Sequence, residues 1–349
     1  MFILGYQPKV WREAQGVILP KANKEDYSLP KSYRPISLLN CLGKTLEKIF
    51  ATRLGYLAST TSLLQDSQLG GRRQRSAIDT VLLLLNNIQS KNSRKKARQR
   101  IATTLFLDVK GAFDHVSANQ LLSICKELGL PIAFTQWVAT FLSNRKLQLS
   151  FNGQIQGKVE LKTGIPQGSP ISPILFLLYL RNICRLETEG AYSLSYMDDF
   201  AVTVTSNSAK SNCKKLERIA RELMSRAKEA AISFDIGKTE LIHFYNKRTT
   251  IEEGLKLGDV EISPKPLVRW LGVFLDSKLT FKQHIKIKIS KAKAAFYLIR
   301  RLGNTQRGLS LQALRQLYIA CVTTIADYGI QCWWKSKSRD YLLARYQSL

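Results

Sequence analysis

The 349-residue chain contains few of the residue types from which metal centres and disulfide frameworks are often built. It has only three histidines, at positions 115, 243 and 284, which are too few and too dispersed for a histidine-based catalytic site. Its six cysteines are scattered and include no Cys-x-x-Cys pair, which argues against a zinc module and a disulfide framework. A reducing compartment fits this composition.

Long apolar runs are also absent. The longest, residues 171–180, has about half the length that a membrane span requires, and no signal peptide stands at the N-terminus. We therefore expect no membrane partner. Structured patterns begin almost at Met1 and continue to Leu349, so we expect a fragment of a longer protein.

Acidic residues are scarce relative to basic ones: 53 Lys and Arg against 26 Asp and Glu give a net charge of +27. Such an excess favours a polyanionic partner, because each neutralised phosphate releases condensed counterions. The alternative is a soluble protein with a basic surface, such as a ribosomal-type protein. Charge alone favours nucleic acid as the partner and indicates no activity.

Hydrophobic periodicity predicts an α+β fold, in which hairpins form a sheet and helices cover it. The strongest hairpin signal is Asn152-Gly153, and a second hairpin bends at Met197-Asp198-Asp199. A basic stretch, residues 91–100, is expected as a solvated loop or a phosphate contact. Strands are expected at residues 10–19, 103–109, 146–151, 154–161, 194–196, 200–205, 232–235, 240–245 and 267–275, and helices at 42–57, 76–88, 117–129, 172–186 and 208–231.

Residues 277–326 contain ten Lys and Arg and no acidic residue. In a helix here, Ile285, Ile289, Ala292 and Phe296 are expected to pack, leaving a basic stripe that suits a phosphate backbone. The alternative, a solvated lysine-rich helix, would normally include glutamates. The predicted nucleic-acid contacts are Lys282, Lys286, Lys288, Lys291 and Lys293.

Three carboxylates form the candidate catalytic site. Asp108 ends a buried strand, and ninety residues later Asp198 and Asp199 stand together at a hairpin bend. Adjacent carboxylates on an apolar hairpin repel one another, and divalent cations relieve that repulsion. Two Mg²⁺ ions could then activate an attacking hydroxyl and stabilise the leaving oxygen. Either motif alone is more often a turn or a cap, so the hypothesis depends on their combination.

Further motifs occur around these carboxylates in a fixed order. They are Gly16-Val-Ile-Leu-Pro-Lys21, Ser32-Tyr-Arg-Pro-Ile-Ser-Leu-Leu39, residues 68–79, Phe106-Leu-Asp-Val-Lys-Gly-Ala-Phe-Asp114, Gly164-Ile-Pro-Gln-Gly-Ser-Pro170, Tyr196-Met-Asp-Asp199, Phe234-Asp-Ile-Gly-Lys-Thr-Glu240 and Trp270-Leu-Gly-Val273. With them the chain resembles the reverse transcriptases of non-LTR (LINE-type) retrotransposons over nearly its whole length.

The resemblance implies a right-hand polymerase with three parts. Fingers would cover residues 1–102, and an antiparallel-sheet palm of ferredoxin- or RRM-like type would cover 103–276 with finger-derived insertions. Residues 277–349 would form a helical thumb and the start of a truncated C-terminal region. The implied activity is RNA-directed DNA polymerisation, with an RNA template, a DNA primer or target, dNTPs and two Mg²⁺ ions (Mn²⁺ as the alternative). The family's work at chromosomal DNA implies an intracellular, nuclear location.

The resemblance also assigns residues to roles. Asp108, Asp198, Asp199 and the Val109 carbonyl would hold the metal ions. Phe113 would lie under the incoming sugar and exclude a 2′-hydroxyl, or be a core aromatic instead. The proposed contacts to the nucleotide and its phosphates are Lys21, Arg34, the Gly111 and Ala112 amides, Gln167, Gly168 and Lys238.

These nucleotide contacts have structural alternatives. Lys21 and Arg34 would otherwise be surface cations, and Gln167 and Gly168 part of a simple turn before a helix. Lys238 would donate a proton to the leaving pyrophosphate. The chain departs from the family pattern at Gly71, where an aromatic is usual, and at Met197, where a smaller residue is usual.

Two other functions remain open. One is a group II intron-type reverse transcriptase and maturase, which the Trp270-Leu-Gly and Arg34-Pro-Ile-Ser motifs disfavour. The other is a decayed element fragment that binds RNA without polymerising. The intact carboxylates and Gln167 argue against such decay.

Overall fold

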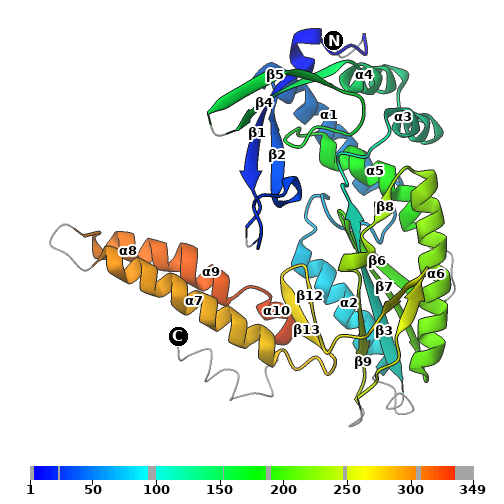
Figure 1. Ribbon diagram of the computed structural model, residues 1–349, viewed down its shortest axis with the longest axis vertical. Coiled ribbons are helices and arrows are strands. Elements are labelled where there is room, and N and C mark those ends of the chain that lie inside the picture. The colour runs from blue at the N-terminus through cyan, green and yellow to red at the C-terminus, as the bar shows by residue number, and fades with distance from the viewer. Residues whose placement is uncertain are drawn as a thin grey trace.

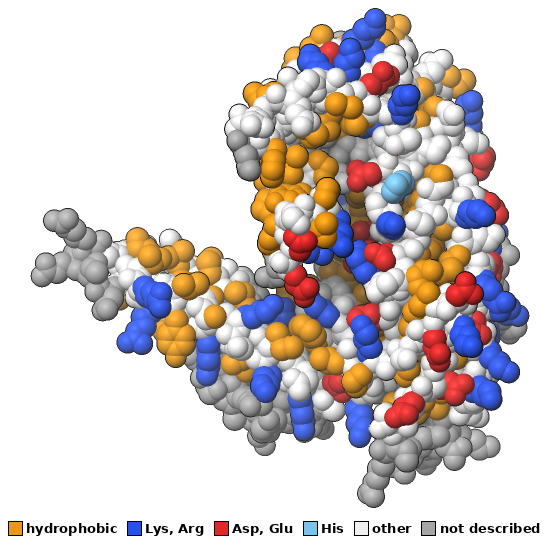
Figure 2. Space-filling model, viewed as in Figure 1, with side chains coloured by type: hydrophobic (Ala, Val, Ile, Leu, Met, Phe, Trp, Pro, Cys, Tyr) orange, Lys and Arg blue, Asp and Glu red, His pale blue; other side chains and the backbone are white. Residues whose placement is uncertain are grey.

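The computed structural model describes residues 4–22, 24–92, 100–151, 153–185, 190–246, 250–303 and 308–334. Figure 1 shows an upper lobe built around a small sheet, a lower lobe built around β3 (Ile101–Lys110), and an arm that α7 (Lys282–Leu302) extends to the left. The face between the upper lobe and the arm is hollowed (Figure 2). Across the described ranges, we find no helix with the length and apolarity of a membrane span.

The upper lobe contains a four-stranded sheet with the order β2-β1-β4-β5, in which β1 runs antiparallel to β2 and parallel to β4. The predicted hairpin of β4 and β5 is confirmed, and Gly153 takes a φ of +77° at its turn. β2 was not predicted, because it contains Pro35, which an edge strand tolerates. The strands are β1 (Glu13–Pro20), β2 (Tyr33–Leu38), β4 (Arg145–Phe151) and β5 (Gln154–Leu161).

Three helices complete this lobe (Figure 1): α1 (Cys41–Thr60), α3 (Ala118–Glu127) and α4 (Ile132–Leu142). Ser117 caps α3 by accepting a hydrogen bond from the Gln120 amide, as its spacing predicts, and Gly129 follows the helix with a φ of +65°. α4 was not predicted. It buries Trp137 and Phe141 in the core that α1 also lines.

The lower lobe is an antiparallel sheet with the order β6-β7-β3-β8, and β9 also pairs with β3. Successive residues of a strand face opposite sides. Leu105 and Leu107 therefore pack in the core that α5 and α6 line, whereas Ala102 and Phe106 pack in the core that α2 lines. The bounds are α2 (Ala77–Asn92), β3 (Ile101–Lys110), α5 (Ser172–Cys184), β6 (Ala191–Tyr196), β7 (Asp199–Ser206), α6 (Ala209–Glu229), β8 (Ser233–Phe234) and β9 (Glu240–Phe244).

The arm follows a hairpin of β12 (Leu267–Trp270) and β13 (Val273–Asp276). The prediction of one strand over residues 267–275 is wrong, because Leu271 and Gly272 take φ values of +46° and +78° and reverse the chain. A short hairpin of β10 (Leu255–Leu257) and β11 (Val260–Ile262), also not predicted, precedes it. The arm's helices are α7 (Lys282–Leu302), α8 (Leu311–Leu317), a π-helical segment (Tyr318–Thr323), α9 (Thr324–Ala326) and α10 (Ile330–Trp333).

The packing face predicted for α7 is confirmed at three of its four positions. Ile285, Ile289 and Ala292 are buried, whereas Phe296 is only partly covered: it is 37% exposed, and its ring packs edge-on against Tyr318 with 6.3 Å between centroids. At this point α7 extends away from the body of the protein and packs on the returning helices of the arm (Figure 1). Residues 93–99 of the basic stretch and residues 335–349 lie outside the described residues.

Candidate active site

Strand pairing brings the predicted carboxylates together. Asp108 lies directly opposite Asp199 in the β3–β7 ladder, and the Val109 amide donates to the Asp198 carbonyl at 3.1 Å. Residues that are directly opposite in an antiparallel pair point to the same face, with Cβ atoms about 4.5–5.5 Å apart. Three carboxylates from two distant motifs therefore meet at the end of the central strand.

The turn that carries the paired carboxylates is held by a segment far away in the sequence. The Leu69 amide donates to the Ser195 carbonyl at 2.9 Å, and the Ser195 amide donates to the Ser67 carbonyl at 2.8 Å. A Cβ atom on Gly70 would lie 2.4 Å from the Met197 nitrogen, so only glycine fits against the turn. This contact between segment 67–70 and the turn was not predicted, although the pair Gly70-Gly71 is a signal of close backbone approach.

Burial and mutual repulsion act on the carboxylates. The pKa of Asp199 is raised to about 6. Burial is the largest cause, and the negative charges of Asp198 and Asp108 raise the pKa further. Burial is also the largest cause that raises the pKa of Asp198. The cluster therefore favours a cation, because a positive charge lowers the cost of keeping these groups ionised.

Lys238 supplies one such charge. Its Nζ lies 2.6 Å from Asp108 Oδ2 and 3.4 Å from Asp235 Oδ2, and the hydrogen bond to Asp108 is the main cause that raises the pKa of Lys238. The resemblance placed this lysine beside the leaving pyrophosphate. The structure places it at the carboxylate cluster itself.

The chemistry of the cluster fits a divalent metal ion. Asp108, Asp198 and Asp199 offer hard oxygen donors, the type that Mg²⁺ prefers. In the part of the chain that the structure describes, no group of three or more His, Cys, Asp or Glu side chains is already arranged to hold a metal ion. Mg²⁺ usually keeps water molecules and takes substrate phosphates as further ligands.

The two predicted cations of the upper lobe lie at the end of its first hairpin. Leu19 pairs with Arg34, and the Lys21 amide donates to the Ser32 carbonyl at 2.8 Å. The charge of Arg34 partly offsets the burial that raises the pKa of Asp198. This hairpin thus brings positive charge within electrostatic range of the carboxylate cluster.

The turn after β3 contains the predicted phosphate contacts. Gly111 takes a φ of +59°, and its carbonyl accepts hydrogen bonds from the Asp114 and His115 amides. Ala112 is buried, and the half-buried Phe113 ring stacks on Phe176 with 5.0 Å between centroids. This stacking is the contact expected if Phe113 is a core aromatic.

Gln167 and Gly168 lie between this turn and β2. The side-chain amide of Gln167 donates to Asp114 Oδ1 at 3.3 Å, and the main-chain carbonyl of Gln167 accepts from the Ser37 amide at 2.7 Å. Gly168 takes a φ of +118°, and a Cβ there would lie 2.5 Å from the Ser37 carbonyl oxygen. The loop 164–170 thus links the turn after β3 with β2 of the upper lobe.

Two buried charged residues that the sequence analysis did not single out hold this loop. The Arg145 guanidinium donates to the Thr163 and Gly164 carbonyls at 2.7 and 2.6 Å. Burial lowers the pKa of Arg145 to about 10. On the other side, the fully buried Glu47 of α1 accepts a hydrogen bond from the Ser169 hydroxyl.

Residues 19–275 match the sequence model of a family described as reverse transcriptase (RNA-dependent DNA polymerase). The chain belongs to the reverse transcriptase family. It is 28% identical to the probable RNA-directed DNA polymerase from transposon BS of Drosophila melanogaster, over 96% of this chain and 37% of that protein. It is 27% identical to the RNA-directed DNA polymerase from mobile element jockey of the same species, over 95% of this chain and 36% of that protein.

The predicted resemblance to non-LTR retrotransposon reverse transcriptases is confirmed by these relatives, of which the chain spans little more than a third. Among solved structures, apo telomerase from Candida tropicalis is similar with a TM-score of 0.53 and 14% identity, covering 93% of this chain and 59% of that one. Telomerase from the same organism in complex with a TWJ fragment of telomeric RNA has a TM-score of 0.50 and 14% identity, covering 98% and 57%. The predicted α+β right-hand polymerase fold is confirmed.

The lysines of α7 do not form one stripe in this reverse transcriptase. At about 100° per residue, Lys282, Lys286 and Lys293 share one side of the helix, whereas Lys288 and Lys291 project from another. Lys288 Nζ lies 4.0 Å above the centre of the Tyr328 ring. The prediction of a single basic stripe is therefore wrong, because the spacing of the five lysines does not follow the helical period.

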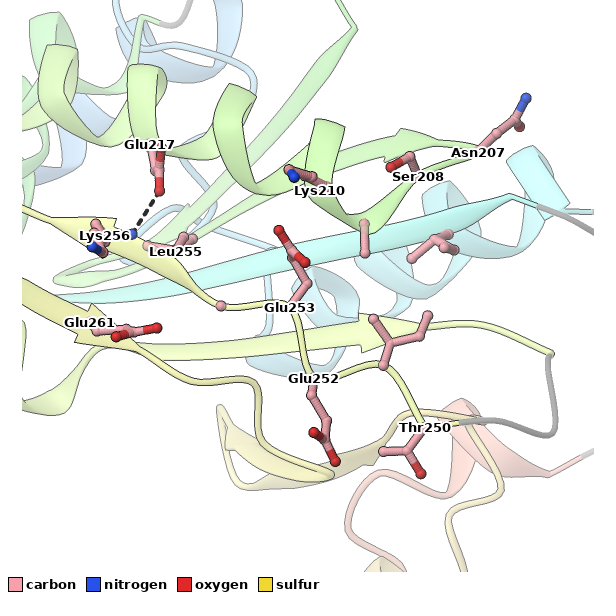
Figure 3. Close-up of a pocket in the computed structure, with 14 residues that line it drawn as sticks. Asn207, Ser208, Lys210, Glu217, Thr250, Glu252, Glu253, Leu255, Lys256 and Glu261 are labelled. Carbon is pink, nitrogen blue, oxygen red and sulfur yellow. Dashed lines mark hydrogen bonds between the residues drawn. The ribbon is translucent and has the colours of Figure 1, made fainter.

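An open pocket of about 880 Å³ lies at the other end of β3, where Ile101 lines it (Figure 3). Ile101 is seven residues from Asp108, or about 23 Å along a strand. Both Lys210 and Glu253 line the pocket, so it presents no uniform charge. None of the predicted site residues of the reverse transcriptase lines it.

Proposed function

We propose that this chain is the polymerase core of a LINE-type element, an RNA-directed DNA polymerase that extends a DNA primer on an RNA template. The observation that carries the proposal is the placement of Asp108 directly opposite Asp199, with Asp198 in the adjoining turn. Asp108, Asp198, Asp199 and the Val109 carbonyl would hold two Mg²⁺ ions, or Mn²⁺ in their place. When bound, the ions would activate the primer 3′-hydroxyl and stabilise the leaving oxygen.

The chain's own residues would orient the dNTP. Lys21 and Arg34 carry positive charge at the end of the first hairpin, and the charge of Arg34 acts on Asp198, so the two would neutralise the triphosphate. Gln167, which donates to Asp114 in the turn after β3, and its neighbour Gly168 would align the nucleotide with the template. The further proposed contacts are the Gly111 and Ala112 amides to phosphate, Phe113 under the sugar, and Lys238 as proton donor to pyrophosphate.

The fingers, palm and thumb would be residues 1–102, 103–276 and 277–349, with residues 145–161 as a fingers insertion into the palm. Their sheet joins β1 and β2, which supports that division. The RNA template and the DNA primer or target would lie in the hollow that Figure 2 shows, between the upper lobe and the arm. Work at chromosomal DNA would place the protein in the nucleus.

Primer extension on poly(rA)/oligo(dT) with Mg²⁺ tests the proposal. We expect the wild type to extend the primer and Asp198→Asn to lose extension while binding the template RNA with unchanged affinity. Glu261→Gln, an exposed carboxylate at the remote pocket, is the matched control and should extend normally. An Asp198→Asn variant with the wild-type rate would contradict the metal site. RNA binding without extension by the wild type would indicate a binding fragment.

A further inference from the structure

Lys238 lies between two carboxylates, and only one of them is a candidate metal ligand. Its ammonium is 2.6 Å from Asp108 and 3.4 Å from Asp235. The Asp235 amide donates to the Asp108 carbonyl at 2.8 Å, and the Lys238 amide donates to the Asp235 carbonyl at 3.1 Å. Backbone hydrogen bonds therefore fix all three residues relative to one another at the end of β3.

The side chain of Asp235 is not needed for this local structure. The 3₁₀ turn Ile236–Lys238 has no side-chain cap from Asp235, and the Thr239 hydroxyl bonds to the Asp235 carbonyl rather than to its carboxylate. The ion pair of the Asp235 carboxylate is with Lys238. The Asp235 carboxylate therefore acts on the Lys238 ammonium.

A divalent cation and the Lys238 ammonium compete for Asp108. The cation would be ligated by a carboxylate oxygen of Asp108, to which the ammonium donates a hydrogen bond. A doubly charged ion also repels an ammonium a few ångströms away. A divalent cation held by Asp108 would therefore weaken the ion pair of this carboxylate with Lys238 and favour release of the ammonium. The Lys238 side chain is 61% exposed, so nothing but a second anion would keep it from moving into solvent.

We propose that Asp235 is a positioning residue that retains Lys238 beside the active site when a divalent cation takes Asp108. The inference rests on the proposed polymerase function, because it gives Lys238 a place from which to reach the leaving pyrophosphate. Asp235 lowers the competition at Asp108 by offering the ammonium an alternative partner. It touches neither substrate nor metal in this role.

The first test measures Mn²⁺ binding to the nucleotide-free protein by electron paramagnetic resonance, so it needs no polymerase activity. Wild type, Asp235→Asn, Lys238→Gln and the double variant form a double-mutant cycle. We expect Lys238→Gln to bind Mn²⁺ several-fold more tightly. With Lys238 present, Asp235→Asn should weaken Mn²⁺ binding by about tenfold. In the Lys238→Gln background, the loss caused by Asp235→Asn should be at least threefold smaller. Part of this loss comes from the direct attraction between the Asp235 charge and the metal ion, and that part is the same in both backgrounds.

Effects that are additive within about twofold would mean that Asp235 acts only through its own charge, and would overturn the proposal. Absence of Mn²⁺ binding by the wild type would instead overturn the metal site, and this inference with it. Glu261→Gln controls for the loss of one negative charge and should leave binding unchanged. Thermal unfolding of each variant, expected within about 2 °C of wild type, shows that the fold is intact.

Extension kinetics supply the second readout. Asp235→Asn should lower kcat at saturating metal and leave the KM for dNTP within about twofold, because the lysine acts on the leaving group. Asp235→Glu keeps the anion and should recover at least half of the lost kcat. A rise in KM with unchanged kcat, or no recovery by glutamate, would contradict a positioning role.

Discussion

The sulfur of Met197 occupies the space that a side chain on Gly71 would need. A Cβ atom on Gly71 would lie 2.8 Å from Met197 Sδ and 3.3 Å from Leu177 Cδ1. From the resemblance to non-LTR reverse transcriptases we expect an aromatic residue at position 71 and a smaller side chain at position 197. The two residues present are complementary, since the methionine fills the volume beside the glycine and packs the turn that carries Asp198 against Gly71.

Alanine at Gly71 and at Gly70 should have different consequences. At Gly71 the new methyl group meets a flexible thioether, and the φ of +70° adds strain of about 1–2 kcal/mol. At Gly70 it meets the Met197 main-chain nitrogen at 2.4 Å, which cannot move without moving the carboxylates. We expect Gly71→Ala to lower primer extension several-fold and Gly70→Ala to lower it at least about 100-fold, as steady-state extension rates would show.

Met197→Ala provides the control, because it removes the thioether and leaves the backbone in place. Combined with Gly71→Ala it should recover part of the lost activity, and combined with Gly70→Ala it should recover none. Equal recovery in both combinations would show that the two glycines do not contact the turn in the way the structure describes.

Arg145→Met should loosen the loop that carries Gln167. The buried guanidinium donates to two carbonyls, and its loss leaves both without a partner, at a cost of about 2–4 kcal/mol. We expect a lower melting temperature and a several-fold higher KM for dNTP. Arg221→Met, on the exposed side of α6, is the matched control and should change stability by less than about 0.5 kcal/mol. Unchanged stability of Arg145→Met would contradict the role of this residue.

Local sequence patterns predicted most of the lower lobe and the carboxylate cluster, since these depend on strand ends and hairpin bends. The ladder that sets Asp108 opposite Asp199 follows from a buried strand and a hairpin that both show clear patterns. Contacts between distant segments could not be predicted in this way. Arg145 has no local signal, and its role depends on a loop eighteen residues away that folds back onto it.

The raised pKa of Asp199 predicts how stability depends on pH in the metal-free protein. The folded state holds this proton up to a pH of about 6, whereas the unfolded state releases it near 3.8. The contribution of this group to stability is therefore lost as pH rises from about 4 to 6. Solvent reaches part of the carboxylate, so we expect about 1–2 kcal/mol rather than the full shift.

Thermal unfolding in EDTA between pH 4 and 7 measures this contribution. Relative to Asp199→Asn, the wild type should lose about 1.5–3 °C of melting temperature across the window. The comparison between the two proteins cancels the effect of the large net charge, which both share. A constant difference between their melting temperatures would show that Asp199 titrates at its ordinary pKa.

The division of the α7 lysines predicts which of them contact nucleic acid. Lys282, Lys286 and Lys293 share one side, so replacing all three by glutamine should weaken binding of an RNA/DNA hybrid. The slope of log Kobs against log salt concentration should become less negative by about 2–3, because each phosphate contact contributes about 0.9. Lys288→Gln is the control: it should leave the slope unchanged and lower stability by about 0.5–1 kcal/mol, since its ammonium lies on the Tyr328 ring. If Lys288→Gln changed the salt slope as much as the triple variant, the nucleic acid would lie on the other side of the helix.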